Sequence, residues 1–414
     1  MLSPRHHPLI EPPELAERDL GKGPVLGHRP AVRLHDASSE NAFTRGGSWP
    51  GRPERSATMR DVQNFADIPA EVRRRVEGDE RVALIFLDAF GLEFLERHLD
   101  HPLIERLEVT PVSAQFPSTT TGHVTTAHFG VPVHEHGLYE WNVLEPSLEE
   151  IICPLRFNAT GFEAEGTLKD RLDPSVLAPG PTLYESLGVP CVVAQPGRLA
   201  GTFSGVATRG AAVIGFRHLD AGVRALADAF AHEECRYGLL YWDLIDRAGH
   251  DHGPGSPEFA AGCKRSLDEV WEAVSELRGV TVLITADHGQ IDVSPERVDY
   301  LDDLWPELPA VLSHSRPAGS SRDVFLHVRS EHVPTVIAEL SARLDGRAEV
   351  RPAAELFDTI GPRLRDRLGD VAVLPSAGRQ AWLRRAAASE QRFRGQHGGL
   401  DEAETSTYLA QLTR

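Results

Sequence analysis

The 414-residue chain has few cysteines and no long apolar run. Its four cysteines are far apart, and none forms a Cys-x-x-Cys pair, which excludes a zinc ribbon and the disulfide framework of a small secreted domain. No stretch approaches the ~18 consecutive apolar residues that a membrane span requires. The N-terminal segment also lacks the apolar core of a secretory signal. We therefore expect a cytoplasmic protein with reduced thiols.

Positive charge is scarce as well. The 43 Lys and Arg residues are outnumbered by 61 Asp and Glu residues, which gives a net charge of −18. Proteins that bind nucleic acid, or that dock on anionic membranes, need a positive surface, so we expect neither partner. With 41% hydrophobic and 25% charged residues, the composition is that of a globular protein with a sizeable core.

The pattern along the chain divides it into two parts. Residues 1–60 are rich in proline and have no sustained apolar periodicity, so we expect a poorly ordered N-terminal extension. Residues 61–414 contain the regular patterns and are expected to form the folded domain.

Short apolar runs alternate with helical patterns from residue 82 onward. Strands buried on both faces are predicted at 82–87, 191–194, 212–216, 238–242 and 280–285, and helices at 119–129, 221–232 and 257–278. This alternation predicts an α/β fold with a mostly parallel central sheet flanked by helices. A strand–helix–strand pattern between 322 and 350 predicts a small inserted α+β cap, within about residues 300–380.

Three of the predicted strands run into aspartate, and two of these tips also carry histidine. The residues are Asp88, Asp246 with His250 four positions later, and Asp287 followed by His288. Because ligands bind at the carboxyl ends of parallel strands, we expect these side chains to converge. Mixed carboxylate and imidazole groups suit zinc and its neighbours. Asp243 competes with Asp246, although a spacing of four residues to His250 favours Asp246.

A run of hydroxyl residues begins the helix predicted at 119–129. Pro117 and Ser118 are typical of a helix start. A hydroxyl at a helix N-terminus lies in an anion-binding position, where it can act as a nucleophile. The three consecutive threonines, 119–121, leave the register open.

Six motifs follow one another in a fixed order. They are Asp88 at a strand end, Phe-Pro-Ser-Thr-Thr at 116–120, Gly-x-Pro-x-x-x-His-Gly at 130–137, Asp-x-x-Gly-His-x-x-Gly-Pro at 246–254, Thr-Ala-Asp-His-Gly at 285–289 and Gly-x-His-Gly-Gly at 395–399. In this order, over residues 82–400, the chain resembles the alkaline phosphatase superfamily and, within it, the type I phosphodiesterase/nucleotide pyrophosphatase branch. The resemblance implies an alkaline-phosphatase-like catalytic domain over 61–414.

The resemblance also implies a two-metal site. One divalent ion would be held by Asp246, His250 and His397, and the second by Asp88, Asp287 and His288. Zinc is the expected metal, and manganese is the alternative. The position ten residues before Gly130 aligns with the nucleophile of the family, which implies Thr120, with Thr119 as the second choice. Asn142 would contact a phosphate oxygen.

The activity implied is hydrolysis of a small phosphate ester, such as a nucleotide, by a phosphodiesterase or nucleotide pyrophosphatase acting through a phosphothreonine intermediate. A phosphomonoesterase, a phosphonoacetate-type hydrolase and a catalytically silent metal-binding relative stay open as alternatives. A sulfatase is disfavoured, because the segment 153–156 places its proline one position too early. Ser118 stands where the family often has Asn, which weakens the case for nucleotide specificity. The sequence gives no oligomeric state.

Overall fold

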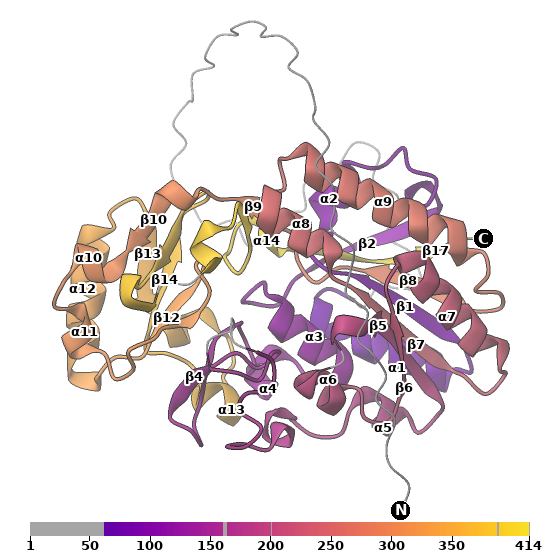
Figure 1. The fold of residues 1–414 in the computed structure, drawn as a ribbon, viewed down its shortest axis with the longest axis horizontal. Coiled ribbons are helices and arrows are strands. Elements are labelled where there is room, and N and C mark those ends of the chain that lie inside the picture. Colours follow the sequence, from indigo (N-terminus) through magenta and orange to yellow (C-terminus); the bar gives the residue numbers. More distant parts are fainter. Residues whose placement is uncertain (1–61, 160–163, 200, 387–388, 414) are drawn as a thin grey trace, which may run out of the picture. The chain divides into compact units, whose positions relative to one another are not determined.

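A seven-stranded sheet lies at the centre of the computed structural model, which describes residues 62–159, 164–199, 201–386 and 389–413 (Figure 1). The strand order is β2-β17-β8-β1-β7-β5-β6. The five strands from β8 to β6 are mutually parallel, and β17 runs antiparallel to both β8 and β2. The predicted α/β fold with a mostly parallel sheet is confirmed. The predicted N-terminal extension, residues 1–60, lies outside the described residues.

Helices flank this sheet. Its strands are β1 (Val82–Leu87), β2 (Leu107–Ser113), β5 (Cys191–Pro196), β6 (Ala212–Phe216), β7 (Tyr237–Trp242), β8 (Thr281–Thr285) and β17 (Ser406–Leu412). The helices of this part of the chain are α1 (Ile68–Glu77), α2 (Leu92–Glu96), α3 (Thr120–Phe129), α4 (Val133–His136), α5 (Leu183–Leu187), α6 (Thr202–Ala207), α7 (Leu219–Ala231), α8 (Leu244–His252) and α9 (Pro257–Val274).

The central strand β1 shows why these apolar runs form a sheet covered on both sides. Side chains alternate between the two faces of a strand. Ala83, Ile85 and Leu87 pack in a core with α7, α8 and α9, whereas the residues between them pack with α1, α3 and α5. Both sets of side chains are buried, so every position of the strand is apolar.

One strand predicted to be buried on both faces is not. The strand β6 is at the edge of the sheet and pairs only with β5 among the described strands. Val213 is 47% exposed, and of the five residues only Phe216 is buried. The apolar run correctly indicates a strand, but it does not reveal that the strand lacks a neighbour on one side.

The helices lie close to their predicted ranges. The segment predicted at 119–129 forms α3, with Thr119 as its N-cap residue. The segment predicted at 257–278 forms α9, which ends earlier, at Val274. The chain then turns through Gly279, which has a φ of +65°, into β8. Early residues of α3 and α8 thereby lie near the carboxyl ends of strands, where the predicted site residues are.

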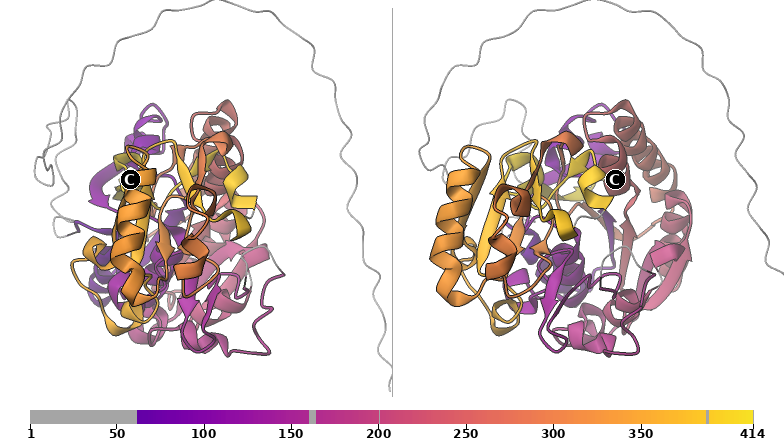
Figure 2. Two further views of the ribbon diagram at one scale, coloured as in Figure 1. Left: turned by 90° about the vertical axis from the view of Figure 1, so that its left-hand side faces the viewer. Right: turned by 60° about the vertical axis from the view of Figure 1, so that its left-hand side comes forward.

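A second, smaller sheet is formed by residues of the segment predicted as a cap. Its order is β11 (Ala318–Gly319), β12 (Val324–Leu326), β14 (Val371–Pro375) and β13 (Ala348–Pro352), and all its pairs are antiparallel. Figure 2 shows α12 (Val333–Arg343) alongside this sheet, and the two share an apolar core. The other helices of this region are α10 (Leu301–Leu304), α11 (Leu308–Val311) and α13 (Pro362–Arg365). We call residues 298–386 the cap.

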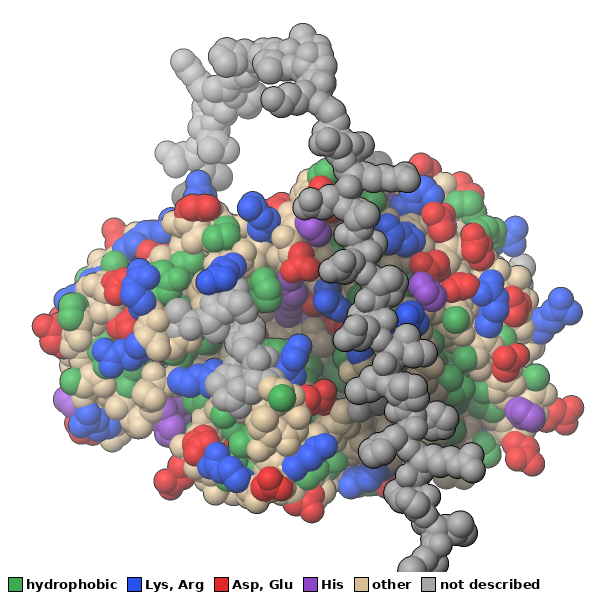
Figure 3. All heavy atoms as spheres, viewed as in Figure 1, with side chains coloured by type: hydrophobic (Ala, Val, Ile, Leu, Met, Phe, Trp, Pro, Cys, Tyr) green, Lys and Arg blue, Asp and Glu red, His purple; other side chains and the backbone are tan. Residues whose placement is uncertain are grey.

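Short strands and one further helix complete the described chain. They are the hairpin β3 (Val143–Glu145) and β4 (Glu150–Ile152), the parallel pair β10 (Val298–Tyr300) and β15 (Gln380–Trp382), the antiparallel pair β9 (Ile291–Asp292) and β16 (Gly395–Gln396), and α14 (Glu402–Thr405). No helix in the described ranges is long and apolar enough to cross a membrane. The four cysteines all lie in the described ranges, where they are buried and form no disulfide. On the face shown in Figure 3, acidic and basic side chains are intermixed.

Two glycines that end helices allow a test of how tightly the cap packs on α4. Gly137 ends α4 with a φ of +72°, and a Cβ there would lie 2.6 Å from the backbone of Arg363 in α13. Gly188 ends α5 with a φ of +64° and has open space around it. Both Gly→Ala changes introduce left-handed strain of ~1–2 kcal/mol, but only Gly137→Ala also adds a backbone clash. We expect Gly137→Ala to lower the free energy of unfolding by ~1–3 kcal/mol more than Gly188→Ala, as measured by urea unfolding. Equal losses would contradict the packing described.

Candidate active site

The side chains predicted to form the site meet at the carboxyl ends of the parallel strands. Asp88 directly follows β1, and Asp287 and His288 follow β8. The helix α8, which begins after β7, carries Asp246 and His250. His397 follows the short strand β16, and Thr120 is the first residue of α3.

Asp88, Asp287 and His288 form the first of two groups whose ligand-type atoms lie within 4.8 Å of one another. The Nε2 atom of His288 is 3.2 Å from Oδ2 of Asp287 and 3.8 Å from Oδ1 of Asp88. Oδ1 of Asp287 accepts hydrogen bonds from the backbone N–H groups of Ala89 and His288, each at 3.0 Å. Oδ2 of Asp287 has no hydrogen-bond donor among the described residues, so it is left for a ligand or a proton.

The second group consists of Asp246, His250 and His397. Nε2 of His250 lies 3.3 Å from Oδ2 of Asp246, and Nε2 of His397 lies 3.6 Å from Oδ1. Gln290 also donates to Oδ1 of Asp246, at 2.5 Å. The His397 ring stacks on the His288 ring with a centroid separation of 3.8 Å, so the two groups are neighbours. Side chains of the second group are 11% to 15% exposed, whereas the first group is buried, so solvent reaches the pair of groups from the second.

The three histidines are oriented in the same way. Each directs its Nδ1 atom to a backbone carbonyl oxygen: His250 to Gly395 at 2.8 Å, His288 to Gly289 at 3.0 Å and His397 to Ser118 at 2.9 Å. A carbonyl oxygen can only accept, so Nδ1 carries the proton and Nε2 faces the carboxylates. This is the arrangement that metal-binding histidines adopt, since the bond at Nδ1 fixes the ring and leaves Nε2 for the ion.

The carboxylates share a buried and negatively charged environment. Burial and the charges of Asp287 and Asp246 raise the pKa of Asp88 well above its usual value. Burial alone would raise the pKa of Asp287, but the neighbouring His288 outweighs it and the pKa falls to about 2. Burial lowers the pKa of His288, and Asp287 more than reverses this, so the pKa is raised. The site thus draws a proton towards Nε2, in the position where a divalent cation would displace it.

The structure distinguishes between the candidate hydroxyl groups. Oγ1 of Thr120 lies 3.3 Å from Oδ1 of Asp88 and 3.3 Å from Nε2 of His288. Oγ1 of Thr119 instead donates to the carbonyl oxygen of Tyr139 at 3.0 Å. Thr120 therefore faces the first group from the N-terminus of α3, where the backbone N–H groups are free to bind an anion.

Two other residues considered from the sequence have partners elsewhere. Asn142 is fully buried, and its side chain donates to the carbonyl oxygen of Gly319 in β11 at 3.0 Å. These contacts tie the loop before β3 to β11, and a contact of Asn142 with phosphate stays a prediction. Asp243, the competitor of Asp246, forms a two-pronged ion pair with Arg198.

Residues that sequence reasoning missed hold the predicted ones in place. The Tyr241 hydroxyl donates to Oδ2 of Asp88, and Gln290 binds Asp246. Tyr241 lies within the apolar run of β7, where a tyrosine is typical of core packing, so no signal marked it. Ser118, noted only as part of a helix start and as a departure from the family pattern, connects the start of α3 to the His397 loop through its carbonyl and its hydroxyl.

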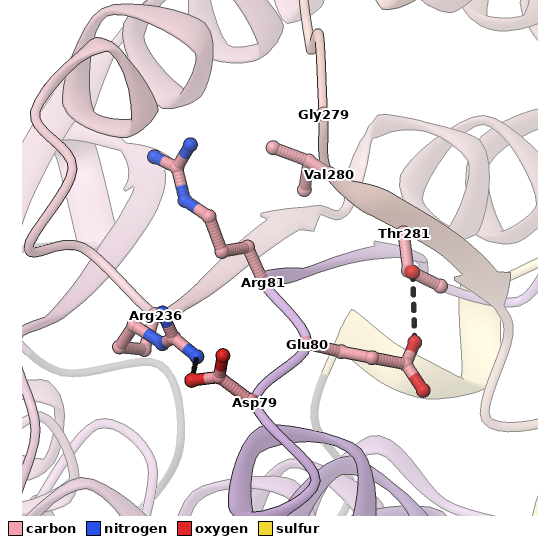
Figure 4. Close-up of a pocket in the computed structure, with 7 residues that line it drawn as sticks. All are labelled: Asp79, Glu80, Arg81, Arg236, Gly279, Val280 and Thr281. Atoms are coloured by element: carbon pink, nitrogen blue, oxygen red, sulfur yellow. Dashed lines mark hydrogen bonds and ion pairs between the residues drawn. The ribbon is translucent and has the colours of Figure 1, made fainter.

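A shallow pocket of about 370 Å³ lies away from this site, near the amino ends of β1, β7 and β8 (Figure 4). Its lining residues are Asp79, Glu80, Arg81, Arg236, Gly279, Val280 and Thr281. Asp79 pairs with Arg236, and the Thr281 hydroxyl donates to Glu80 at 2.8 Å, so both carboxylates of the pocket already have partners. The pocket takes no part in the site at the carboxyl ends.

The raised pKa of Asp88 has a consequence for stability without metal. Ionising a carboxyl group whose folded-state pKa is above its unfolded value of ~3.9 destabilises the fold, and the loss grows as the pH rises through the folded-state pKa. Asp88→Asn removes this charge. At pH 8 in a chelator we expect the variant to have a Tm equal to or above that of the parent protein, and to gain less from added Zn²⁺. Thermal unfolding measures both effects, and a clearly lower Tm of the metal-free variant would contradict this account of the electrostatics.

Residues 188–400, half of the chain, match the family model of type I phosphodiesterase / nucleotide pyrophosphatase. The bis(5'-adenosyl)-triphosphatase ENPP4 of Bos taurus is 34% identical over 76 residues, a match that spans only 16% of this chain and 16% of that protein.

Solved structures share the fold over most of the chain. The murine ectonucleotide pyrophosphatase/phosphodiesterase 5, in an inactive form with AMP, has a TM-score of 0.60 at 16% identity, covering 80% of this chain and 87% of that one. Phosphonoacetate hydrolase from Sinorhizobium meliloti 1021, in complex with phosphonoformate, has a TM-score of 0.59 at 16% identity, covering 81% and 90%. Together with the family match, these findings confirm the resemblance seen in the sequence. The chain belongs to the type I phosphodiesterase/nucleotide pyrophosphatase family of phosphoester hydrolases.

Proposed function

We propose that this protein is a two-metal phosphodiesterase that cleaves a small phosphate ester through a phosphothreonine formed on Thr120. The observation that carries the proposal is the position of the Thr120 hydroxyl, at a helix N-terminus and 3.3 Å from both Asp88 and His288. A nucleophile, a cluster of cation-binding groups and an anion-binding helix end therefore coincide.

The residues present fit two divalent ions. Asp246, His250 and His397 would hold one, and Asp88, Asp287 and His288 the other, with zinc the first choice and manganese the alternative. Three histidine Nε2 atoms face carboxylates, and Oδ2 of Asp287 lacks a donor among the described residues, so the donor set suits cations. When bound, such ions stabilise negative charge on a phosphate and lower the pKa of an oxygen nucleophile.

The chain's own residues would aim the nucleophile and receive its proton. Asp88 Oδ1 is a carboxylate acceptor within hydrogen-bond distance of the Thr120 hydroxyl. Tyr241 holds the other oxygen of Asp88, which keeps Oδ1 directed at Thr120. Attack forms the bond from Oγ1 to phosphorus and breaks the bond from phosphorus to the leaving oxygen, which takes up the proton that Thr120 gave to Asp88. Water then cleaves the phosphothreonine, and Oγ1 regains a proton.

A diester is the favoured substrate class. A monoester brings an additional negative charge, which basic side chains would have to meet. Arg316, a basic side chain of the cap, instead donates to the backbone carbonyl of Ala159 and, at 3.5 Å, to Oδ1 of Asn142. The murine relative binds AMP and the bovine relative is a bis(5'-adenosyl)-triphosphatase, which supports a nucleotide as the substrate. The phosphonoacetate hydrolase binds phosphonoformate, which supports a small phosphonate as the second substrate to assay.

Alanine substitutions test whether Thr120 or Thr119 is the nucleophile. With bis-p-nitrophenyl phosphate and Zn²⁺ or Mn²⁺, we expect Thr120→Ala to lower kcat/KM at least ~1,000-fold, because the covalent step is lost. Thr119→Ala is the matched control and should lower it by less than ~10-fold, since that hydroxyl binds a backbone carbonyl. A loss of kcat/KM above ~10-fold in Thr119→Ala would contradict the assignment of Thr120 as the nucleophile. Assays with p-nitrophenyl phosphate and phosphonoacetate establish whether a monoester or a phosphonate is preferred.

The second group of predicted ligands is tested by metal content. We expect Asp246→Asn to retain one equivalent of Zn²⁺ where the parent retains two, because a ligand charge is lost. Asp243→Asn, three residues earlier and paired with Arg198, should retain two. Elemental analysis after gel filtration gives both values. Two equivalents in Asp246→Asn, or one in Asp243→Asn, would contradict the proposed ligand set.

A further inference from the structure

The glycines that follow His397 make room for side chains of the cap. Gly398 has a φ of +118°, and a Cβ there would lie 2.8 Å from Oδ1 of Asp323 and 2.9 Å from Oγ of Ser320. A Cβ on Gly399 would lie 2.9 Å from Nη2 of Arg322. The loop that carries His397 is thus in close contact with the turn between β11 and β12, and larger residues at these two positions would force them apart.

Arg322 is the most firmly held side chain of this turn. It is 1% exposed, and its Nη1 atom donates to three backbone carbonyls of the β14–β15 connection, those of Pro375, Ser376 and Arg379, at 2.8 to 2.9 Å. Nε and Nη2 donate to the two carboxylate oxygens of Glu404, at 3.2 and 2.9 Å, and Nη2 also donates to Asp401 at 2.8 Å. Each guanidinium nitrogen is engaged, so the position of Glu404 is fixed relative to the cap.

Glu404 in turn touches the backbone beside a predicted ligand of each metal. Its Oε1 atom accepts a hydrogen bond from the N–H of Gly399, two residues after His397, at 3.0 Å. Its own carbonyl oxygen accepts from the N–H of Gly289, the residue after His288, also at 3.0 Å. The side chain of Glu404 is fully buried, and without its guanidinium partner such a carboxylate would be strongly destabilised.

The His397 loop is also held from the nucleophile side. The Ser118 hydroxyl donates to the carbonyl oxygen of Gly399 at 3.0 Å and accepts from the N–H of Gly398 at 3.1 Å. Ser118 lies outside the cap, and Glu404 binds the same loop at the N–H of Gly399. The loop is therefore held by Ser118 and by Glu404, and Arg322 of the cap fixes Glu404 in turn.

We propose that Arg322 is a positioning residue for the metal centre: through Glu404 it fixes the backbone next to His397 and His288, so the cap sets the affinity for metal. The proposal rests on the proposed function, because it assigns a role towards the ions. Residues that orient metal ligands without touching the ion typically contribute about 10- to 100-fold to the metal affinity.

The test compares two buried Arg–Glu pairs of the cap region in the metal-free protein. Arg322→Lys keeps the charge but cannot reproduce the guanidinium bonds. The matched control is Arg367→Lys, since Arg367 binds Glu145 at 2.8 Å and both side chains are buried. Titration with Zn²⁺ against a chelating indicator, in a Thr120→Ala background, measures affinity independently of turnover. We expect binding to be ~10- to 100-fold weaker in Arg322→Lys and to change less than ~3-fold in the control.

A second variant keeps the test decisive if Arg322→Lys does not fold. Glu404→Gln retains the shape and an acceptor for Gly399 but loses the charge, and we expect the same direction of change. Near-ultraviolet circular dichroism establishes which variants are folded. Parent-like Zn²⁺ affinity in a folded variant, or equal weakening in Arg367→Lys, would overturn the proposal. A parent protein that binds no Zn²⁺ would overturn the proposed function itself, which is a different result.

Discussion

The structure depends on one electrostatic constraint: three carboxylates and three imidazoles share a small space at the carboxyl ends of the parallel strands. Carboxylates that are buried together raise one another's proton affinity, as Asp88 shows, and the carboxylate of Asp287 raises the pKa of the His288 imidazole that faces it. A divalent cation at each group would satisfy several of these atoms at once. The surrounding structure fixes this otherwise unfavourable arrangement.

The scaffold supplies that fixation unequally. Asp88, Asp287 and His288 extend directly from the ends of β1 and β8, the buried centre of the sheet, so their positions follow from strand pairing. Asp246 and His250 share one face of α8. His397 lies on a glycine-rich loop with no regular structure of its own, and it depends on Ser118 and on Glu404 of α14, which Arg322 of the cap fixes. This difference is the reason why we propose a role for the cap in metal binding.

Much of this arrangement could be predicted from the sequence, for physical reasons that differ between residues. Buried parallel strands have continuous apolar runs, so the aspartates that follow them could be placed together at the carboxyl ends of the strands. His397 and Thr120 came from the family resemblance, since no periodicity brings a loop to a helix start almost 280 residues earlier. The exposed edge strand β6 and the bonds of Tyr241 and Arg322 depend on tertiary neighbours. The substrate contact of Asn142 has only the resemblance to support it.

The most direct test of the central claim is a crystal structure of the Zn²⁺-loaded protein with anomalous diffraction at the zinc edge. The account predicts two anomalous peaks, one bound by Asp246, His250 and His397 and the other by Asp88, Asp287 and His288, with Oγ1 of Thr120 directed at the second. A single peak, or peaks bound by other residues, would contradict it.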